Sequence, residues 1–292
     1  MVSIEKMTYS NPESLVSTMW LDEHLSFPSV RVIDATSYMP SQDKDGFEQY
    51  NKQHIPGAVY FDINDIADES NALPHMIPSP EKFSSKVRKL GLGDGDKIVV
   101  YDANGGYLAA ARVWWMFRLY GHSDVCLLDG GLPKWLAEER SIEVITPIQK
   151  DRHFTAQMDK SFVRSVEQMI SNVGTKNEQV VDARSVGRFK GEEPEPRPSA
   201  KVGHIPGSLS LPFNTILNPK NHFTYRSAEE IKATISNAGI DLSKPITTSC
   251  GSGVTACVLA FGLFLIGYEN AAVYDGSWSE WGDHPDTPVD QG

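Results

Sequence analysis

Cys250 opens a short segment, Cys250-Gly-Ser-Gly-Val-Thr255, whose residue types suit nucleophilic sulfur chemistry. Gly251 and Gly253 can adopt positive φ angles, which would turn successive backbone N–H groups toward one point. A helix that starts after the segment would add the partial positive charge of its N-terminus. These surroundings lower the pKa of a thiol, and they would also hold a thiolate that carries one extra sulfur, a persulfide. We therefore expect Cys250 to be a nucleophile.

The other two cysteines have a different setting. Cys126 stands in VCLLD and Cys257 lies seven residues after Cys250, and both apolar contexts predict buried core positions. Three cysteines cannot all pair within one chain, and their spacing gives no metal site. This cysteine usage is typical of a reducing compartment.

The residues around Cys250 predict how the chain positions it. Ile246–Ser249 is a run typical of a buried parallel strand, and Ala256–Ile266 predicts a helix that ends at Gly267. Ligands of α/β proteins bind at such junctions between a strand and a helix. The same pattern predicts further strands at 30–34, 98–101 and 180–182. It also predicts a second helix at 109–120, which ends at Gly121.

Several short sequences occur twice at a nearly constant separation. VIDAT at 32–36 returns as VVDAR at 180–184, and LLDGGLPKW at 127–135 returns as VYDGSWSEW at 273–281. The sequence HIPG occurs at 54–57 and again at 204–207. We expect two tandem α/β domains, each a parallel sheet flanked by helices, at 1–140 and 161–292, with a linker at 141–160.

The first copy provides an internal control. At an offset of 146 residues Asn104 occupies the position of Cys250, so the first domain is expected to lack the thiol and to be catalytically inactive. His54 and His204 belong to the HIPG motif that both copies share, which favours an architectural role for them. The tryptophans at 114, 115, 278 and 281 are expected to pack in the core or between domains.

Composition narrows the function classes. The 292 residues carry a net charge of −11 and no long basic run, which argues against binding to nucleic acid or anionic membranes. The N-terminal residues contain no apolar signal segment, and the longest apolar stretch, near VLAFGLFLIGY, is too short to span a membrane. These features predict a cytoplasmic protein.

Taken together, the repeated HIPG, the Cys-Gly-Ser-Gly-Val-Thr loop confined to the second copy, and YDGSWSEWG near the end resemble the tandem-domain sulfurtransferases of the rhodanese superfamily, in particular those that use 3-mercaptopyruvate. The resemblance runs from about Val30 to Gly282. It implies transfer of a sulfane sulfur through a persulfide on Cys250 to a thiophilic acceptor such as thioredoxin, glutathione or cyanide, with release of pyruvate. It implies no cofactor and no metal.

The resemblance also assigns roles to individual residues. Arg188 in VGRFKG and Arg197 in the Pro-rich loop 191–201 match positions that bind the substrate carboxylate, a task suited to a guanidinium. Gly251, Gly253, Val254 and Thr255 belong to the loop that binds the substrate. Ser252, with His75 and Asp62 from the first domain, matches a proton-transfer assembly. Arg184, two residues beyond a predicted strand, is expected to be structural.

Three other functions are compatible with parts of this pattern. A cysteine phosphatase or arsenate reductase needs an arginine at the far end of the loop, but residue 256 is alanine and no arginine follows before Gly267. A thiosulfate:cyanide sulfurtransferase shares the chemistry, although its loop carries basic residues after the cysteine and this loop has none. A non-catalytic persulfide carrier or regulatory module is the third alternative, which the intact Cys250 loop disfavours.

Overall fold

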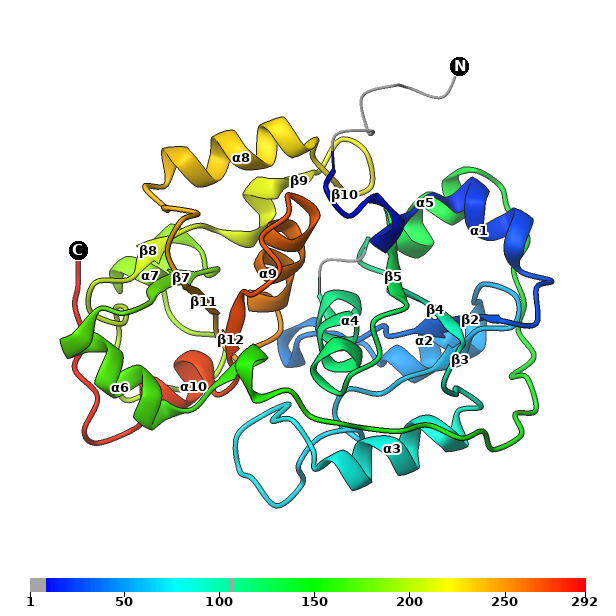
Figure 1. The fold of residues 1–292 in the computed structure, drawn as a ribbon, viewed down its shortest axis with the longest axis horizontal. Helices are drawn as coiled ribbons and strands as arrows, with labels where there is room; N and C mark the ends of the chain where they lie inside the picture. Colours follow the sequence, from blue (N-terminus) through cyan, green and yellow to red (C-terminus); the bar gives the residue numbers. More distant parts are fainter. Residues whose placement is uncertain (1–8, 106–107) are drawn as a thin grey trace.

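The computed structural model describes residues 9–105 and 108–292, which form two α/β domains side by side (Figure 1). The sheet of the first domain has five parallel strands in the order β1-β5-β4-β2-β3. Its strands are β1 (Leu15–Val16), β2 (Val30–Asp34), β3 (Val59–Tyr60), β4 (Lys97–Tyr101) and β5 (Val125–Leu128). Its helices are α1 (Thr18–His24), α2 (Gly46–Lys52), α3 (Pro80–Lys89), α4 (Ala109–Leu119) and α5 (Gly131–Ala137).

The second domain repeats this topology. Its sheet also has five parallel strands, in the equivalent order β6-β12-β11-β7-β8. Its strands are β6 (Val163–Arg164), β7 (Gln179–Asp182), β8 (Leu209–Ser210), β11 (Ile246–Ser249) and β12 (Ala272–Tyr274), and a short antiparallel hairpin adds β9 (Leu217–Asn218) and β10 (Thr224–Tyr225). Its helices are α6 (Val166–Thr175), α7 (Val186–Lys190), α8 (Ala228–Asn237), α9 (Ala256–Leu265) and α10 (Ser277–Trp281).

The fold class expected from the sequence is confirmed, and the central elements lie within one residue of their expected bounds. The central strands β4 and β11 are buried along nearly their whole length, which is why they read as continuous β-branched and apolar runs. Helices α4 and α9 stop where Gly121 and Gly267 adopt φ angles of 89° and 93°, which residues with a Cβ rarely adopt.

Helices α4 and α9 lie next to each other between the two sheets and form the centre of the domain interface (Figure 1). The ring of Trp114 on α4 packs edge-on against Phe261 on α9, with ring centroids 4.7 Å apart. This contact agrees with the packing role expected for Trp114. One apolar core therefore runs from the first domain into the second.

Reciprocal hydrogen bonds join the domains at both ends of this interface. Asp275 of the second domain accepts the backbone N–H of Ile77 at 2.9 Å, and Asp129 of the first domain accepts that of Tyr225 at 3.0 Å. Ile77 and Tyr225 are 148 residues apart and Asp129 and Asp275 are 146 apart, so equivalent residues make equivalent bonds. The two domains are related by an approximate two-fold arrangement.

The segment between the domains has no helix or strand from residue 144 to residue 159. It nevertheless packs on the first domain: Phe154 is buried against Phe83 and Phe117, and the N–H of Gln157 donates to the carbonyl of Tyr120. The exact boundaries at 140 and 160 stay predictions. Within the described part of the chain, no helix is long and apolar enough to cross a bilayer.

Candidate active site between the two domains

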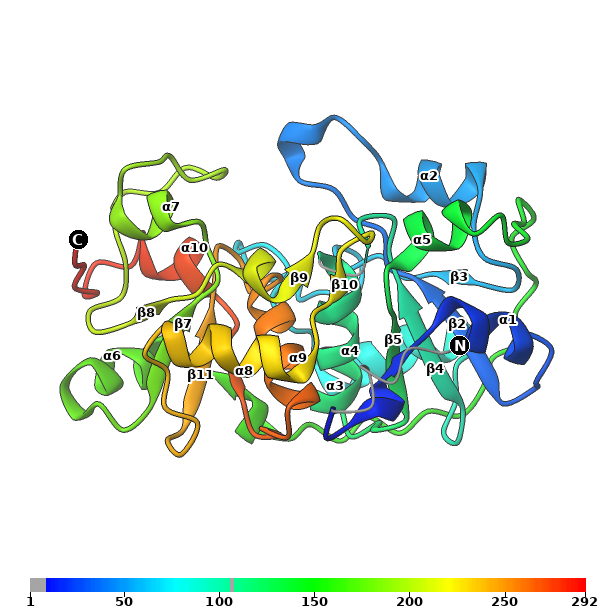
Figure 2. The same ribbon diagram turned by 90° about the horizontal axis from the view of Figure 1, so that it is seen from above.

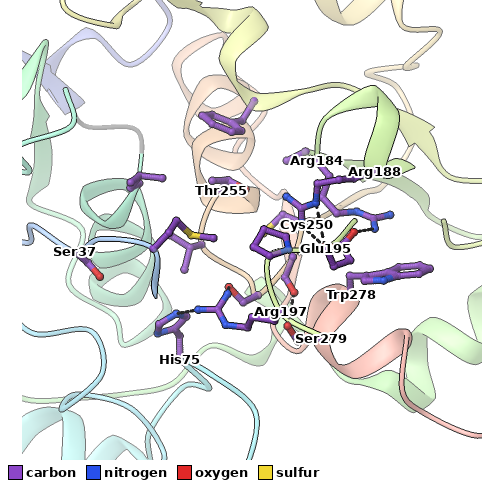
Figure 3. A pocket seen from close by; sticks show the side chains of 18 of the residues that line it. Ser37, His75, Arg184, Arg188, Glu195, Arg197, Cys250, Thr255, Trp278 and Ser279 are labelled. Carbon is purple, nitrogen blue, oxygen red and sulfur yellow. Dashed lines mark hydrogen bonds and ion pairs between the residues drawn. The ribbon is translucent and has the colours of Figure 1, made fainter. Parts of the chain in front are cut away.

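Cys250 follows the last residue of β11 and lines a cavity of about 230 Å³ between the domains (Figure 3). Most residues expected at the site line this one cavity: His75, Arg188, Arg197, Cys250, Gly251, Ser252, Val254 and Thr255. Figure 2 shows the β2–α2 connection and the α7 region projecting on the same side of the molecule, one from each domain. Ser37, Tyr38 and Met39 from that connection also line the cavity. Nothing in the sequence around these three residues indicates a role in chemistry.

The two loop glycines are required for different reasons. Gly253 has a φ angle of 73°, and a Cβ there would lie 2.6 Å from the carbonyl oxygen of Asp275. Gly251 does not have the positive φ angle that the sequence analysis anticipated. A Cβ on Gly251 would instead lie 2.8 Å from Nη2 of Arg188, so this glycine lets the guanidinium approach the loop.

The residues after β12 hold the Cys250 loop from the other side. The N–H of Cys250 donates to Oγ of Ser277 at 3.1 Å, and the N–H of Trp278 donates to the carbonyl of Cys250 at 3.0 Å. Ser279 donates to the carbonyl of Gly251 through both its N–H, at 2.8 Å, and its hydroxyl, at 2.7 Å. The repeated YDGSW sequence is the signal that could have identified this support. Trp278, expected only to pack, also forms part of the cavity wall.

The strand registers correct the expected counterpart of Cys250 in the first domain. Tyr101 pairs with Asp34 as Ser249 pairs with Asp182, so Asp102, not Asn104, takes the place of Cys250. The carbonyl of Asp102 accepts the N–H of Leu132, just as that of Cys250 accepts the N–H of Trp278. The offset is 148 at the strand and 146 only farther along, which is why counting back 146 residues reached Asn104.

Arg197 contacts both Ser252 and His75, and Figure 3 shows its contact with His75. Its Nη1 lies 3.3 Å from Oγ of Ser252, and its Nη2 lies 3.1 Å from Nε2 of His75. Because a guanidinium only donates, Nε2 of His75 is the acceptor and Nδ1 carries the proton. Burial and the positive charges of Arg197 and Arg112 lower the pKa of His75 to about 3, so the imidazole is neutral near pH 7. Nδ1 has no hydrogen-bond partner among the described residues.

Asp62 lies apart from this assembly. Its Oδ1 accepts the backbone N–H of Asn64 at 2.8 Å in a local turn, and its side chain does not line the cavity. Since Nδ1 of His75 has no partner among the described residues, Asp62 does not orient the imidazole in this conformation. Gly253 does not line the cavity either, although its carbonyl belongs to the loop.

Arg188 on α7 and Arg184 after β7 share a carboxylate that the sequence analysis did not identify, Glu195. Oε1 of Glu195 accepts from Arg184 at 2.7 Å, while Oε2 accepts from Nε of Arg188 at 3.0 Å and also from its Nη2. Arg184 is fully buried, forms a second ion pair with Asp182 at 2.6 Å, and lies over the ring of Trp278. The structural role expected for Arg184 agrees with these contacts.

A buried ion pair connects the first domain to the Cys250 loop. Arg112 on α4 lies 2.6 Å from Asp275 of the second domain, with both side chains almost fully buried. It also donates to the carbonyl of His75 at 2.6 Å and to that of Gly253 at 3.3 Å. His75 itself has a φ angle of 61°. Arg112 therefore fixes the loop that carries His75 against the loop that carries Cys250.

The remaining cysteines and histidines lie outside the cavity. Burial raises the pKa values of both Cys126 and Cys257 to about 12, so these thiols stay protonated. His54 and His204 are buried, hydrogen-bond to backbone carbonyls, and stack on Tyr50 and Phe189 respectively. The described residues contain no group of three potential metal ligands.

Comparisons with known proteins agree with this architecture. The model of the rhodanese-like domain matches the chain twice, at residues 17–138 and 165–284. The chain belongs to the rhodanese family. Within this family, it is 41% identical to the 3-mercaptopyruvate sulfurtransferase of Mus musculus, over 92% of this chain and 91% of the relative. It is also 40% identical to the thiosulfate sulfurtransferase of Gallus gallus, over 92% and 93% of the two chains.

Among solved rhodanese structures, SseA from Escherichia coli, described as a 3-mercaptopyruvate sulfotransferase, superposes with a TM-score of 0.83 and 35% identity. The match covers 91% of this chain and 99% of that one. Two relatives with different named donors are thus nearly equally similar to this rhodanese. Overall sequence identity therefore does not distinguish the two sulfur donors, and the distinction has to come from the residues of the site.

Proposed function

We propose that this rhodanese is a sulfurtransferase that takes the sulfane sulfur of 3-mercaptopyruvate onto Cys250 and passes it to a thiophilic acceptor, a thiol or cyanide. The observation that carries the proposal is the position of Cys250 beside Arg188 and Arg197 in an interdomain cavity. A small α-keto acid needs a cation for its carboxylate and a nucleophile close to that cation, and this cavity holds both.

In the first half-reaction, the thiolate of Cys250 attacks the sulfur of 3-mercaptopyruvate. A bond forms between the two sulfur atoms while the bond from the donor sulfur to its methylene carbon breaks. The electron pair of that bond goes to the carbon and gives the enolate of pyruvate, which takes up a proton. Arg197 and Arg188 hold the carboxylate throughout and stabilise the negative charge of the enolate.

In the second half-reaction, the acceptor attacks the outer sulfur of the persulfide. The bond between the sulfurs breaks, its electron pair returns to Cys250 as a thiolate, and the acceptor leaves with the sulfur. A thiol such as glutathione or thioredoxin gives a persulfide, and cyanide gives thiocyanate. The N-terminus of α9 begins six residues after Cys250, and its helix dipole would stabilise an anionic sulfur there.

We further propose that Ser252 and His75 move the proton that the enolate requires. In the free site Arg197 occupies Nε2 of His75 and Oγ of Ser252. A substrate carboxylate would compete for the Arg197 guanidinium, which would leave the imidazole and the hydroxyl available to each other. The role expected for Asp62 would need a movement of its turn.

A double-mutant test separates a proton relay from a role of Ser252 in size alone. If the relay operates, Ser252→Ala and His75→Ala each lower kcat on the order of 100-fold. Combining them costs little more than either change alone, because groups that act as a unit are non-additive. Additive losses, or an unaffected His75→Ala enzyme, would contradict the relay.

Turnover with 3-mercaptopyruvate and with thiosulfate tests the function directly, with Cys250→Ser as the control. We expect the higher kcat/KM for 3-mercaptopyruvate. After donor treatment without acceptor, mass spectrometry should find one added sulfur on the peptide that contains Cys250. An added sulfur on Cys126 or Cys257 instead would refute the assignment of the nucleophile.

The alternative, a thiosulfate:cyanide sulfurtransferase, has support from the chicken relative. The absence of a charged side chain within the loop 250–255 argues against a dianionic donor. We also propose a cytoplasmic location, which rests on the three cysteines being unpaired.

A further inference from the structure

Glu195 is the one acidic side chain among the described residues that line the cavity, which three arginines also line. Its side chain is 8% exposed, so water screens its charge poorly. It lies between Arg184 and Arg188 and accepts hydrogen bonds from both (Figure 3). The guanidinium of Arg188 is therefore already paired with a carboxylate before any donor binds.

The arginines around the cavity differ in whether they have a carboxylate partner. Asp182 and Glu195 together compensate Arg184 and Arg188. Arg197, by contrast, contacts only neutral partners, Ser252 and the neutral His75. Arg112 and Asp275 neutralise each other beneath the loop. Among the three arginines that line the cavity, Arg197 is therefore the one without a carboxylate partner among the described residues.

Arg197 can pair with the single carboxylate of a monoanionic donor. A donor with two negative charges, such as thiosulfate, would bring a second charge close to Glu195 without a cation left to compensate it. The charge that Cys250 carries is the same for every donor and does not affect this comparison. Overall similarity to relatives does not distinguish the donors, whereas this charge balance does.

We propose that Glu195 is a specificity-determining residue, whose carboxylate sets the charge of the donor site and selects monoanionic over dianionic sulfur donors. The inference rests on the proposed function of the same site. It is distinct from a role of Glu195 in merely orienting Arg188. An orienting role affects all donors alike, whereas a charge role affects them according to their charge.

The test compares Glu195→Gln with the wild-type enzyme on both donors. Glutamine retains the shape and one acceptor oxygen but removes the charge. We expect the ratio of kcat/KM for thiosulfate to that for 3-mercaptopyruvate to rise on the order of tenfold, the effect of one unit charge at short range in a partly buried site. An unchanged ratio, with or without a loss of activity on both donors, would overturn the inference.

Two further variants keep the test sharp. Glu193→Gln makes the same charge change in the same loop, at an exposed side chain outside the cavity that accepts from Ser185, and should leave the ratio unchanged. Glu195→Asp keeps the charge and should keep the wild-type ratio even if the shorter side chain lowers the overall rate. A ratio that rises equally in Glu193→Gln would show a general effect of net charge and refute a specific role for Glu195.

Binding of products and analogues provides a readout that needs no turnover of thiosulfate. Pyruvate, a monoanion, and oxaloacetate, a dianion, are competed against 3-mercaptopyruvate. Glu195→Gln should lower the inhibition constant of oxaloacetate relative to that of pyruvate, and equal changes for both would contradict the charge role. If the wild-type enzyme shows no sulfur transfer from 3-mercaptopyruvate at all, the proposed function fails. If transfer occurs but neither ratio responds, only the inference about Glu195 fails.

Discussion

The loop that starts at Cys250 and the loop that starts at Asp102 occupy equivalent places in the two domains but carry different side chains at their first position. In the first domain the carboxylate of Asp102 turns into its own loop. Its Oδ1 accepts the N–H of Asn104 at 2.8 Å, and its Oδ2 accepts those of Ala109 and Ala110 at 3.2 and 3.1 Å. In the second domain Cys250 stands at this position and lines the cavity.

This difference indicates what the loop backbone favours. In the first domain Asp102 accepts N–H groups at the start of α4, and in the second domain α9 starts six residues after Cys250. The comparison therefore indicates that the side chain at this position lies close to the start of the following helix. The carboxylate of Asp102 is used in hydrogen bonds to its own loop, whereas Cys250 lines a cavity.

The partners that cover the two loops differ as well. Gly105 lies against His222 and Phe223 of the second domain, and Gly253 lies against Arg112 of the first. Phe223 is 148 residues after His75, and the two share positive φ angles of 56° and 61°. The loop of the first domain is thus covered by a segment that carries Phe223, where the equivalent segment over the second-domain loop carries His75.

Exchanging the residue that differs should give the largest effect. Cys250→Asp makes the active loop like the inactive one. Because the first domain accommodates an aspartate at this position, the variant should fold, while sulfur transfer should fall by at least about 1,000-fold with the nucleophile gone. Circular dichroism and turnover of 3-mercaptopyruvate measure the two outcomes. Appreciable remaining turnover would show that Cys250 is not the nucleophile.

The two candidate carboxylate-binding arginines should differ in importance. Arg197 has no carboxylate partner among the described residues, whereas Arg188 is paired with Glu195. Removing a charge-assisted hydrogen bond costs about 1.5–3 kcal/mol, so kcat/KM should fall about 100-fold in Arg197→Ala and about tenfold in Arg188→Ala. Lys190→Ala, at an exposed position of the same helix as Arg188, is the matched control. The reverse order would show that Arg188 leaves Glu195 to bind the donor.

His75 should make stability depend on pH. Its pKa is about 3 in the folded protein, below the value of about 6.5 of an unperturbed imidazole. The unfolded state therefore takes up a proton first as the pH falls, and stability that is complete above about pH 6.5 declines toward pH 3. Between pH 7 and pH 5 this group should cost about 2 kcal/mol of unfolding free energy.

His75→Phe, which copies the first-domain loop's partner Phe223, should remove that part of the pH dependence. Urea unfolding of both proteins at pH 7, 6 and 5 measures the difference. Parallel pH profiles for the variant and the wild type would mean that folding does not lower the pKa of His75.

The smallest effect on catalysis should come from the inactive loop. Asp102→Ala removes the acceptor of several backbone N–H groups and should lower stability by about 1–3 kcal/mol, which thermal unfolding detects as a shift of several degrees. The kcat for 3-mercaptopyruvate should stay within about twofold of the wild-type value. A large loss of activity in a folded variant would show that the first loop contributes to the reaction.

Much of the architecture could be predicted because it depends on local patterns. Buried parallel strands appear in the sequence as continuous β-branched runs, and helices end at glycine. The duplication is visible in the repeated sequence motifs. The expected cavity residues were assembled by resemblance, and the structure brings most of them to one place. Asp102 was missed because the offset between the copies changes after the strand, and a count from the later motif misses by two residues.

Other features depend on contacts between residues far apart in the sequence, which no local pattern reveals. Arg112 reads as one charged residue in an Ala-rich and aromatic helix, and only the packing of the domains shows that it meets Asp275. Glu195 reads as one of several acids in a Pro-rich loop. Only the structure shows that its side chain is buried and paired with two arginines.

The reciprocal bonds from Ile77 to Asp275 and from Tyr225 to Asp129 give the chain the geometry of a homodimer whose subunits have been fused. In a true homodimer every substitution appears twice, so a change that spoils one active site spoils both. In this chain each half can change alone while it continues to cover its neighbour. A duplicated chain can therefore keep a nucleophile in one half while the other half supplies part of the cavity wall.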